Sequence, residues 1–165
     1  MSPMNDPKAL VQVDYADLAR KLDALVAGER DEVAIMATLA CEVHHSDGRF
    51  DWTGFYRVRG PGLLKIGPYQ GGHGCLLIPF ARGVCGAAAR TGQVQLVPDV
   101  EAFPGHIPCA TSTRSELVLP VWNGAGQLIG VFDLDSDQPD AFTPKDAEQL
   151  AAILKSSQKK ELLEF

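Results

Sequence analysis

The sequence has no long apolar run and no surplus of positive charge. No hydrophobic stretch approaches the roughly 20 residues that a membrane-spanning helix needs, and residues 1–8 lack the charged and apolar regions of a secretory signal peptide. The 15 Lys and Arg residues are outnumbered by 21 Asp and Glu residues, so the net charge is −6 and no basic stripe is available to neutralise phosphates. We therefore expect a cytoplasmic protein whose partners include neither a membrane nor a nucleic acid.

Cysteine is scarce, and no Cys-x-x-Cys pair occurs. The four cysteines are Cys41, Cys75, Cys85 and Cys109. Their spacing argues against a disulfide-stapled miniprotein, a thioredoxin-like motif and a ribbon-type zinc site. In the cytoplasm all four are expected to be reduced at rest, so a disulfide among them would be a catalytic or regulatory event.

The 165 residues are 45% hydrophobic and 22% charged, which is close to the average for globular proteins. This length and composition suit one domain with a substantial core rather than two domains. No internal repeat, linker or low-complexity segment divides the chain. We predict an N-terminal tail over residues 1–13 and a single domain over residues 14–165.

Helical periodicity marks both ends of the domain. A first helix is predicted after Asp14, its N-cap, and a second carries an apolar stripe over residues 33–43. Within the second helix Cys41 is expected to be an inert core thiol, and His44 and His45 are expected to interact with its dipole. A closing helix is predicted from Pro144, with Thr143 as the N-cap and Asp146 in a capping-box-like position.

The middle of the chain has the period of two that is typical of strands. Strands are predicted over residues 51–58, 63–66, 75–79, 94–97, 116–122 and 127–135, with a short helix over residues 83–89. Residues 98–115 are expected to form a long irregular loop, and loops of that length are usually functional. Segregated helices and a meandering sheet predict an α+β domain.

The last predicted strand ends in two carboxylates. Alternation places Ile129, Val131, Asp133 and Asp135 on one face and Leu128, Phe132 and Leu134 on the other. Like charges this close repel, so we expect one carboxyl to have a raised pKa and to supply a proton near neutral pH. Two alternatives remain open: the aspartates solvate the strand end, or they join Asp137 in a calcium loop, which lacks the required glycine.

Aromatic and sulfur-bearing residues suggest further parts of a site. Trp52 and Tyr56 share one strand face, where they form either two walls of a cage for an apolar or cationic group or ordinary core packing. Histidines close to two of the cysteines favour reactive thiolates or a zinc site. These pairs are His73 with Cys75 and His106 with Cys109.

Six segments together resemble the free methionine-R-sulfoxide reductases, which are single GAF-domain enzymes. The resemblance runs from about residue 14 to the closing helix, and generic GAF sensors lack the spacing of its last three cysteines. The segments are Asp51-Trp-Thr-Gly-Phe-Tyr56, Cys75-Leu-Leu-Ile-Pro79, Gly83-Val-Cys85-Gly86, Phe103-Pro-Gly-His-Ile-Pro-Cys109, Ser115-Glu-Leu-Val-Leu-Pro120 and Gly130-Val-Phe-Asp-Leu-Asp-Ser136.

The resemblance implies a GAF fold, with a central antiparallel sheet, helices on one side and ligand-binding loops on the other. It also implies reduction of free L-methionine-(R)-sulfoxide to L-methionine with no bound cofactor. Thioredoxin would be the electron donor, itself supplied by NADPH and thioredoxin reductase. The resemblance further suggests a homodimer.

By the same resemblance, Cys109 is the nucleophile that attacks the sulfoxide sulfur, and Cys75 or Cys85 then converts its sulfenic acid into a disulfide. Polar substrate groups would be bound by Glu116, Asp133 and Asp135, while Trp52 and Tyr56 would enclose the S-methyl group. The family commonly has an acidic residue after the nucleophile, where this chain has Ala110, and Pro108 precedes the cysteine.

Two other functions are compatible with the sequence. A non-catalytic GAF module would bind a small molecule or sense thiol oxidation, although such a module needs neither a nucleophile nor a resolving cysteine. A zinc-binding domain would use the two His–Cys pairs.

Overall fold

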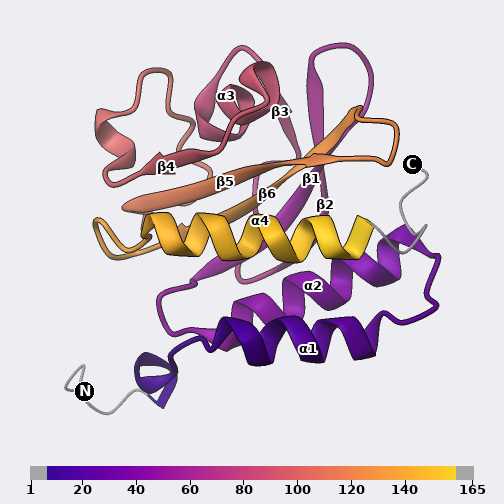
Figure 1. Cartoon of the computed structure of the whole chain (residues 1–165). Coiled ribbons are helices and arrows are strands. Elements are labelled where there is room, and N and C mark those ends of the chain that lie inside the picture. Colours follow the sequence, from indigo (N-terminus) through magenta and orange to yellow (C-terminus); the bar gives the residue numbers. More distant parts are fainter. Residues whose placement is uncertain (1–6, 159–165) are drawn as a thin grey trace.

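The computed structural model describes residues 7–158, and their central feature is one six-stranded antiparallel sheet of order β3-β2-β1-β6-β5-β4. β1 and β6 lie at its centre, and the short β3 and β4 form its edges (Figure 1). The strands are β1 (Trp52–Val58), β2 (Leu63–Gln70), β3 (Leu77–Pro79), β4 (Gln95–Val97), β5 (Ser115–Trp122) and β6 (Leu128–Ser136). The predicted α+β GAF architecture is confirmed, and β2 runs four residues beyond its predicted end.

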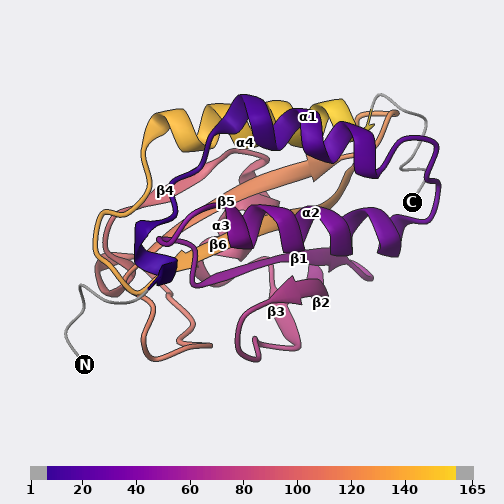
Figure 2. The same cartoon turned by 90° about the horizontal axis from the view of Figure 1, so that it is seen from below.

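Helices cover both faces of the sheet unequally. The long helices α1 (Tyr15–Leu25), α2 (Glu32–Ser46) and α4 (Pro144–Gln158) lie on one side, where α2 contacts β1 and β2 and α4 contacts β5 (Figures 1 and 2). The short α3 (Gly83–Thr91) lies on the opposite side with the long loops. This agrees with the expected arrangement of helices on one side and loops on the other, with α3 among the loops. Among the described residues, none of the helices is long and apolar enough to cross a bilayer.

Side-chain caps define where the long helices begin. Asp14 accepts a hydrogen bond from the backbone N–H of Asp17, and Asp31 accepts two at the start of α2. At α4 the Thr143 hydroxyl accepts from the N–H of Asp146, whose carboxylate accepts from the N–H of Thr143. These contacts confirm the N-caps predicted at Asp14 and Thr143, because each satisfies backbone donors that a helix terminus leaves unpaired.

The helix side of the sheet is a continuous apolar core. Phe55, Leu117, Phe132 and Leu134 point into it from β1, β5 and β6, and each is at most 3% exposed. The rings of Phe55 and Phe132 stack with centroids 4.5 Å apart. This core buries the apolar stripes of α1, α2 and α4 and holds the central strands rigidly against them.

A β-bulge corrects one detail of the predicted alternation. The pairing of β5 and β6 shifts between Val121, which faces Gly130, and Trp122, which faces Leu128. Ile129 therefore packs against the helix-side core and Leu128 against the opposite side, the reverse of the prediction. From Val131 to Asp135 the alternation holds, because the extra residue of the bulge precedes that stretch.

The prediction that Cys41 of α2 is an inert core thiol was wrong. Cys41 is only half-buried, and its sulfur lies 3.8 Å from Nδ1 of His45. His44, in the last turn of the same helix, is buried and contacts the Thr53 hydroxyl, 3.2 Å from its Nδ1. Burial lowers the pKa of His44 to about 4, with the nearby positive charge of Lys8 as the next cause.

A charged network ties the helical layer together beside the first strand. Arg49 donates to the carboxylates of Asp47 and Asp146, and Tyr15 donates to Asp146 across 2.6 Å. The backbone N–H of Val13 also donates to Asp47, so this part of the predicted tail is bonded to the domain. A cavity of about 390 Å³ opens here. Because both carboxylates are already paired with Arg49, we assign the network to folding. Residues 1–6 of the predicted tail lie outside the described residues.

Candidate active site

Three carboxyl groups meet on the sheet face opposite the long helices. Strand register explains their proximity: Asp135 of β6 pairs with Glu116 of β5 on one side and with Trp52 of β1 on the other. Asp133 lies two residues earlier on the same face, opposite Gly54. The predicted pair of aspartates is thus a trio, and the third member comes from the neighbouring strand.

Burial makes this trio unusual. Glu116 is 7% exposed and Asp133 3% exposed, although unpaired carboxylates are rarely buried. Burial is the main cause that raises the pKa of Glu116, Asp133 and Asp135 well above ordinary values, and a neighbouring carboxylate is the next cause in each case. The expectation of a raised pKa is confirmed. The cluster can hold protons near neutral pH and donate one to a ligand oxygen.

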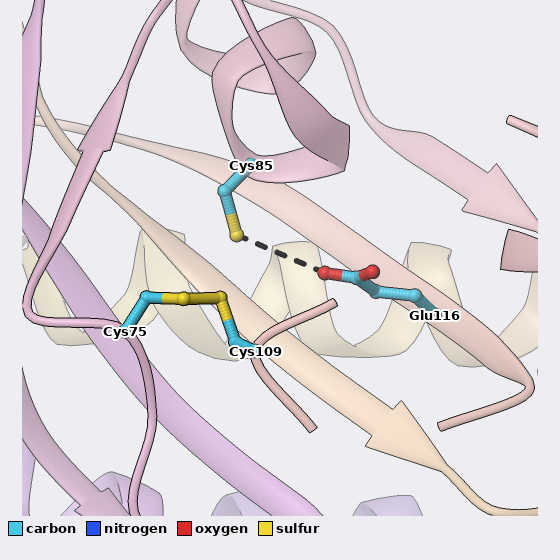
Figure 3. The surroundings of a disulfide bond; sticks show 4 residues. All are labelled: Cys75, Cys85, Cys109 and Glu116. Carbon is cyan, nitrogen blue, oxygen red and sulfur yellow. Dashed lines mark hydrogen bonds between the residues drawn. A yellow bond between two sulfur atoms is a disulfide. The ribbon is translucent and has the colours of Figure 1, made fainter. Parts of the chain in front are cut away.

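Cys85 approaches the trio from α3. Its sulfur lies 3.8 Å from Oε1 of Glu116, and Figure 3 shows the side chain reaching from the helix toward that carboxyl. A side chain at Gly86 would put its Cβ 2.7 Å from the carbonyl oxygen of Pro79, so glycine there lets α3 pack closely enough. Burial, then the charge of Asp133, raises the pKa of the Cys85 thiol. Cys85 therefore stays protonated and is a weak nucleophile.

Cys75 and Cys109 form a disulfide beside Cys85 (Figure 3). Their Cα atoms are 5.3 Å apart, although 34 positions separate them in the sequence. Cys75 follows the glycine-rich loop before β3, and Cys109 lies in the long loop before β5. The structure thus holds one of the two disulfides that the resemblance implied, and it joins Cys75 rather than Cys85 to Cys109.

Aromatic rings form one wall of the same site. Trp52 stacks on Tyr56 with ring centroids 5.7 Å apart and on Tyr69 at 5.3 Å, and its indole N–H donates to the carbonyl of Gly72. A Cβ at Gly54 would lie 2.6 Å from the indole ring, so glycine leaves the room that this ring occupies. Tyr69 was missed because β2 was predicted to end at Ile66, and because a register shift in the pairing of β1 with β2 places Tyr69 opposite Gly54.

These groups enclose one cavity of about 40 Å³, room for a few water molecules. Its wall combines the carboxyl trio and Cys85 with Cys109, the Trp52 and Tyr56 rings, Ala110 and Thr113. Oδ1 of Asp133 and Oδ1 of Asp135 are buried without a hydrogen-bond partner. Buried polar atoms are rarely left unpaired, so this pattern indicates a site for a polar ligand.

The zinc and calcium sites considered as alternatives differ from what the structure brings together. His73 and His106 line the cavity, but Cys75 and Cys109 are bonded to each other and offer no thiolate in this form. Asp137 lies in an exposed turn, away from the cavity wall that Asp133 and Asp135 share. Within residues 7–158, one group has ligand atoms close enough to share a cation: Cys85, Glu116 and Asp133.

Comparison with known proteins agrees with this geometry. The GAF domain family matches residues 29–155. Protein YtsP of Bacillus subtilis is 39% identical over 88% of this chain and 90% of its own, and the free methionine-R-sulfoxide reductase of Escherichia coli is 39% identical over 88% and 87%. The structure of free methionine-R-sulfoxide reductase from Neisseria meningitidis in complex with its substrate has a TM-score of 0.84 at 35% identity, covering 92% of this chain and 95% of that one. The chain belongs to the GAF-domain family and, within it, to the free methionine-R-sulfoxide reductases.

Proposed function

We propose that this protein reduces free L-methionine-(R)-sulfoxide to L-methionine. The observation that carries the proposal is the juxtaposition, in one cavity, of a cysteine pair, a buried carboxyl trio and an aromatic wall. Sulfoxide reduction by a thiol needs a sulfur nucleophile, a proton source for the departing oxygen and an apolar surface for the methyl group. The relative from Escherichia coli and the structure from Neisseria meningitidis carry the name of this activity.

In the reduced protein, the Cys109 thiolate attacks the sulfoxide sulfur. The carboxyl trio protonates the sulfoxide oxygen, which passes to the Cys109 sulfur as the bond between the two sulfurs breaks, leaving methionine and a Cys109 sulfenic acid. The Cys75 thiol then attacks Cys109, which releases water and forms the disulfide. A dithiol, thioredoxin in our proposal, returns two electrons and two protons and regenerates both thiols.

Binding groups follow from the same geometry. Glu116, Asp133 and Asp135 offer negative charge to the ammonium group of a free amino acid, and a residue within a peptide lacks that ammonium. Trp52 and Tyr56 present apolar ring faces to the S-methyl group. Burial raises the pKa of the Tyr56 hydroxyl, followed by the charge of Asp133, so the hydroxyl remains a neutral donor.

Cys75 is proposed as the resolving cysteine because it is the residue bonded to Cys109. Cys85 remains a buried thiol beside Glu116 and helps to shape the floor of the cavity. Ala110 lines the cavity directly after Cys109. An alanine there adds no negative charge beside the nucleophile, so the protons and charges for catalysis would come from the trio. A cytoplasmic location and a homodimer also remain proposals.

The decisive experiment is turnover with thioredoxin, thioredoxin reductase and NADPH, followed as NADPH loss. We expect repeated turnover of the R epimer, none of the S epimer and none of a peptide-bound sulfoxide. Cys109→Ser should abolish turnover, while Cys41→Ser, which removes a thiol far from the cavity, should retain it. One disulfide per chain without repeated turnover would contradict the proposal and favour the alternative, a GAF redox sensor.

A further inference from the structure

Cys85, Glu116 and Asp133 form a compact group of potential ligands at the floor of the cavity. One ligand atom from each lies within 4.8 Å of the other two, and the three come from α3, β5 and β6. All three side chains are buried, unlike most acidic clusters, which are solvated. Oδ1 of Asp133 has no hydrogen-bond partner although the residue is only 3% exposed. The group is therefore preassembled around an unsatisfied acceptor.

Its chemistry matches borderline-soft divalent ions. Zinc and cobalt accept thiolate sulfur together with carboxylate oxygen, whereas magnesium and calcium prefer oxygen ligands alone. Tetrahedral zinc with bonds of about 2.0 Å to oxygen and 2.3 Å to sulfur separates its ligand atoms by about 3.3–3.6 Å. The Cys85 sulfur and Glu116 Oε1 are already 3.8 Å apart. The other two pairs of ligand atoms lie within 4.8 Å, so binding would draw the three side chains together at the wall of the cavity that they line.

We propose that Cys85, Glu116 and Asp133 bind a zinc-class divalent cation, and that this cation and the ammonium group of free methionine exclude each other. The second half rests on the proposed function, because it assumes that the ammonium uses the same carboxylates. Binding changes no oxidation state: the thiol proton of Cys85, and any proton held by the two carboxyls, passes to solvent as the metal–ligand bonds form.

The disulfide form allows a clean test, because Cys75 and Cys109 are then tied to each other. Only Cys41 and Cys85 remain as free thiols. We would titrate the oxidised, metal-free protein with Co²⁺ and follow the near-ultraviolet charge-transfer absorption of a cobalt–thiolate bond. We expect saturation at one cobalt per chain and loss of the band when Zn²⁺ is added.

Two variants locate the site. Cys85→Ser should abolish the band and weaken Co²⁺ binding, measured by calorimetry, by about tenfold or more. Cys41→Ser is the matched control. Cys41 and the neighbouring His45 are another pair of side chains that could bind Co²⁺ through a thiolate, and the cobalt band of this variant should equal that of the wild type. Asp133→Asn keeps the side-chain shape and should weaken binding comparably, which covers the case in which Cys85→Ser fails to fold. No band in the wild type, or a band that survives Cys85→Ser or disappears in Cys41→Ser, would overturn the proposal.

Competition tests the second half. Free methionine should raise the apparent Kd for Co²⁺ more than an equal concentration of glycine, which chelates Co²⁺ in solution in the same way but lacks the side chain that fits the cavity; equal effects would refute mutual exclusion. Turnover measured in EDTA reports on the proposed function separately. Turnover without a cobalt band would remove the metal site alone, and a cobalt band without turnover would remove the reductase function alone.

Discussion

The two faces of β5 and β6 show how one pair of strands serves two purposes. Glu116 and Asp133 face the cavity, and their neighbours Leu117 and Leu134 face the helices. On the helix side, full burial of apolar groups stabilises the fold. On the cavity side, equally deep burial of carboxyl groups costs stability, because the charged forms lose solvation. The free-energy cost of burying the reactive carboxyl groups is therefore offset by the apolar side chains that alternate with them along the same strands.

The largest effect should come from breaking the chemistry of the cavity face without touching the core. We expect Cys75→Ser to lower thioredoxin-dependent turnover by about a thousandfold or more, because the Cys109 sulfenic acid loses its resolving thiol. One equivalent of methionine per chain should still form, leaving a sulfenic acid that dimedone traps. The thermal midpoint of the reduced variant should equal that of the reduced wild type. Undiminished turnover would transfer the resolving role to Cys85.

A substitution in the helix-side core should lower the stability of the protein and leave substrate binding in the cavity unchanged. Phe132→Ala removes a ring that is 1% exposed and stacked on Phe55, and we expect a loss of about 3–5 kcal/mol in the free energy of unfolding. Urea denaturation measures this loss, and Leu25→Ala, at a side chain that is 53% exposed, is the control. The folded fraction should retain the wild-type KM for the sulfoxide. A loss below about 1 kcal/mol would mean that the core repacks around the missing ring.

The period-two alternation of the sequence predicted which side chains of β6 face the cavity over the part of the strand that pairs regularly. Alternation alone placed Val131, Asp133 and Asp135 on one face, and the structure agrees because β6 has no irregularity over that stretch. The same rule failed at Leu128 and Ile129, where the bulge adds a residue that no local pattern announces. Alternation is a property of one strand, so it cannot detect a change in pairing with the next.

Contacts between distant segments were the least predictable. Glu116 joins Asp135 only through strand register, and Cys75 reaches Cys109 only because two loops fold over the same end of the sheet. Spacing in the chain left Cys75 and Cys85 equivalent as partners. Family resemblance supplied the set of residues, but the three-dimensional arrangement was needed to distinguish a buried thiol from the bonded one.

A buried histidine on the helix side gives the next prediction. The pKa of His44 falls from 6.5 to about 4, mainly through burial, so the folded state keeps it neutral while the unfolded chain takes up a proton. The stability that this provides is present above about pH 6.5 and is lost as the pH falls toward 4, by about 3 kcal/mol in total. Urea midpoints should therefore drop across this window. His44→Asn, which keeps a polar contact for Thr53 but does not titrate there, should have a flatter profile; an equally steep one would exclude His44 as the cause.

The smallest effect should appear on the cavity side and have the opposite sign. Burial, then the charge of Asp133, raises the pKa of Glu116 well above 4.5, so the folded state holds more protons than the unfolded chain above that pH. The stabilising effect of the protonated form is complete below about pH 4.5 and is lost as the pH rises through the raised pKa. Glu116→Gln removes this loss and still accepts a contact from the Cys85 thiol.

Glu116→Gln should therefore match the wild type near pH 5 and exceed its stability at pH 8 by about 1–2 kcal/mol, in contrast to any substitution in the core. At pH 8 the KM for the sulfoxide should also rise, because the glutamine cannot offer the substrate ammonium the negative charge of the ionised Glu116 carboxylate. Glu148→Gln, an exposed change on α4, should alter neither quantity. If Glu116→Gln proved less stable than the wild type at pH 8, the carboxyl trio would be a stabilising network. Burial of carboxyl groups on the cavity face would then not cost stability, which contradicts the contrast drawn between the two faces.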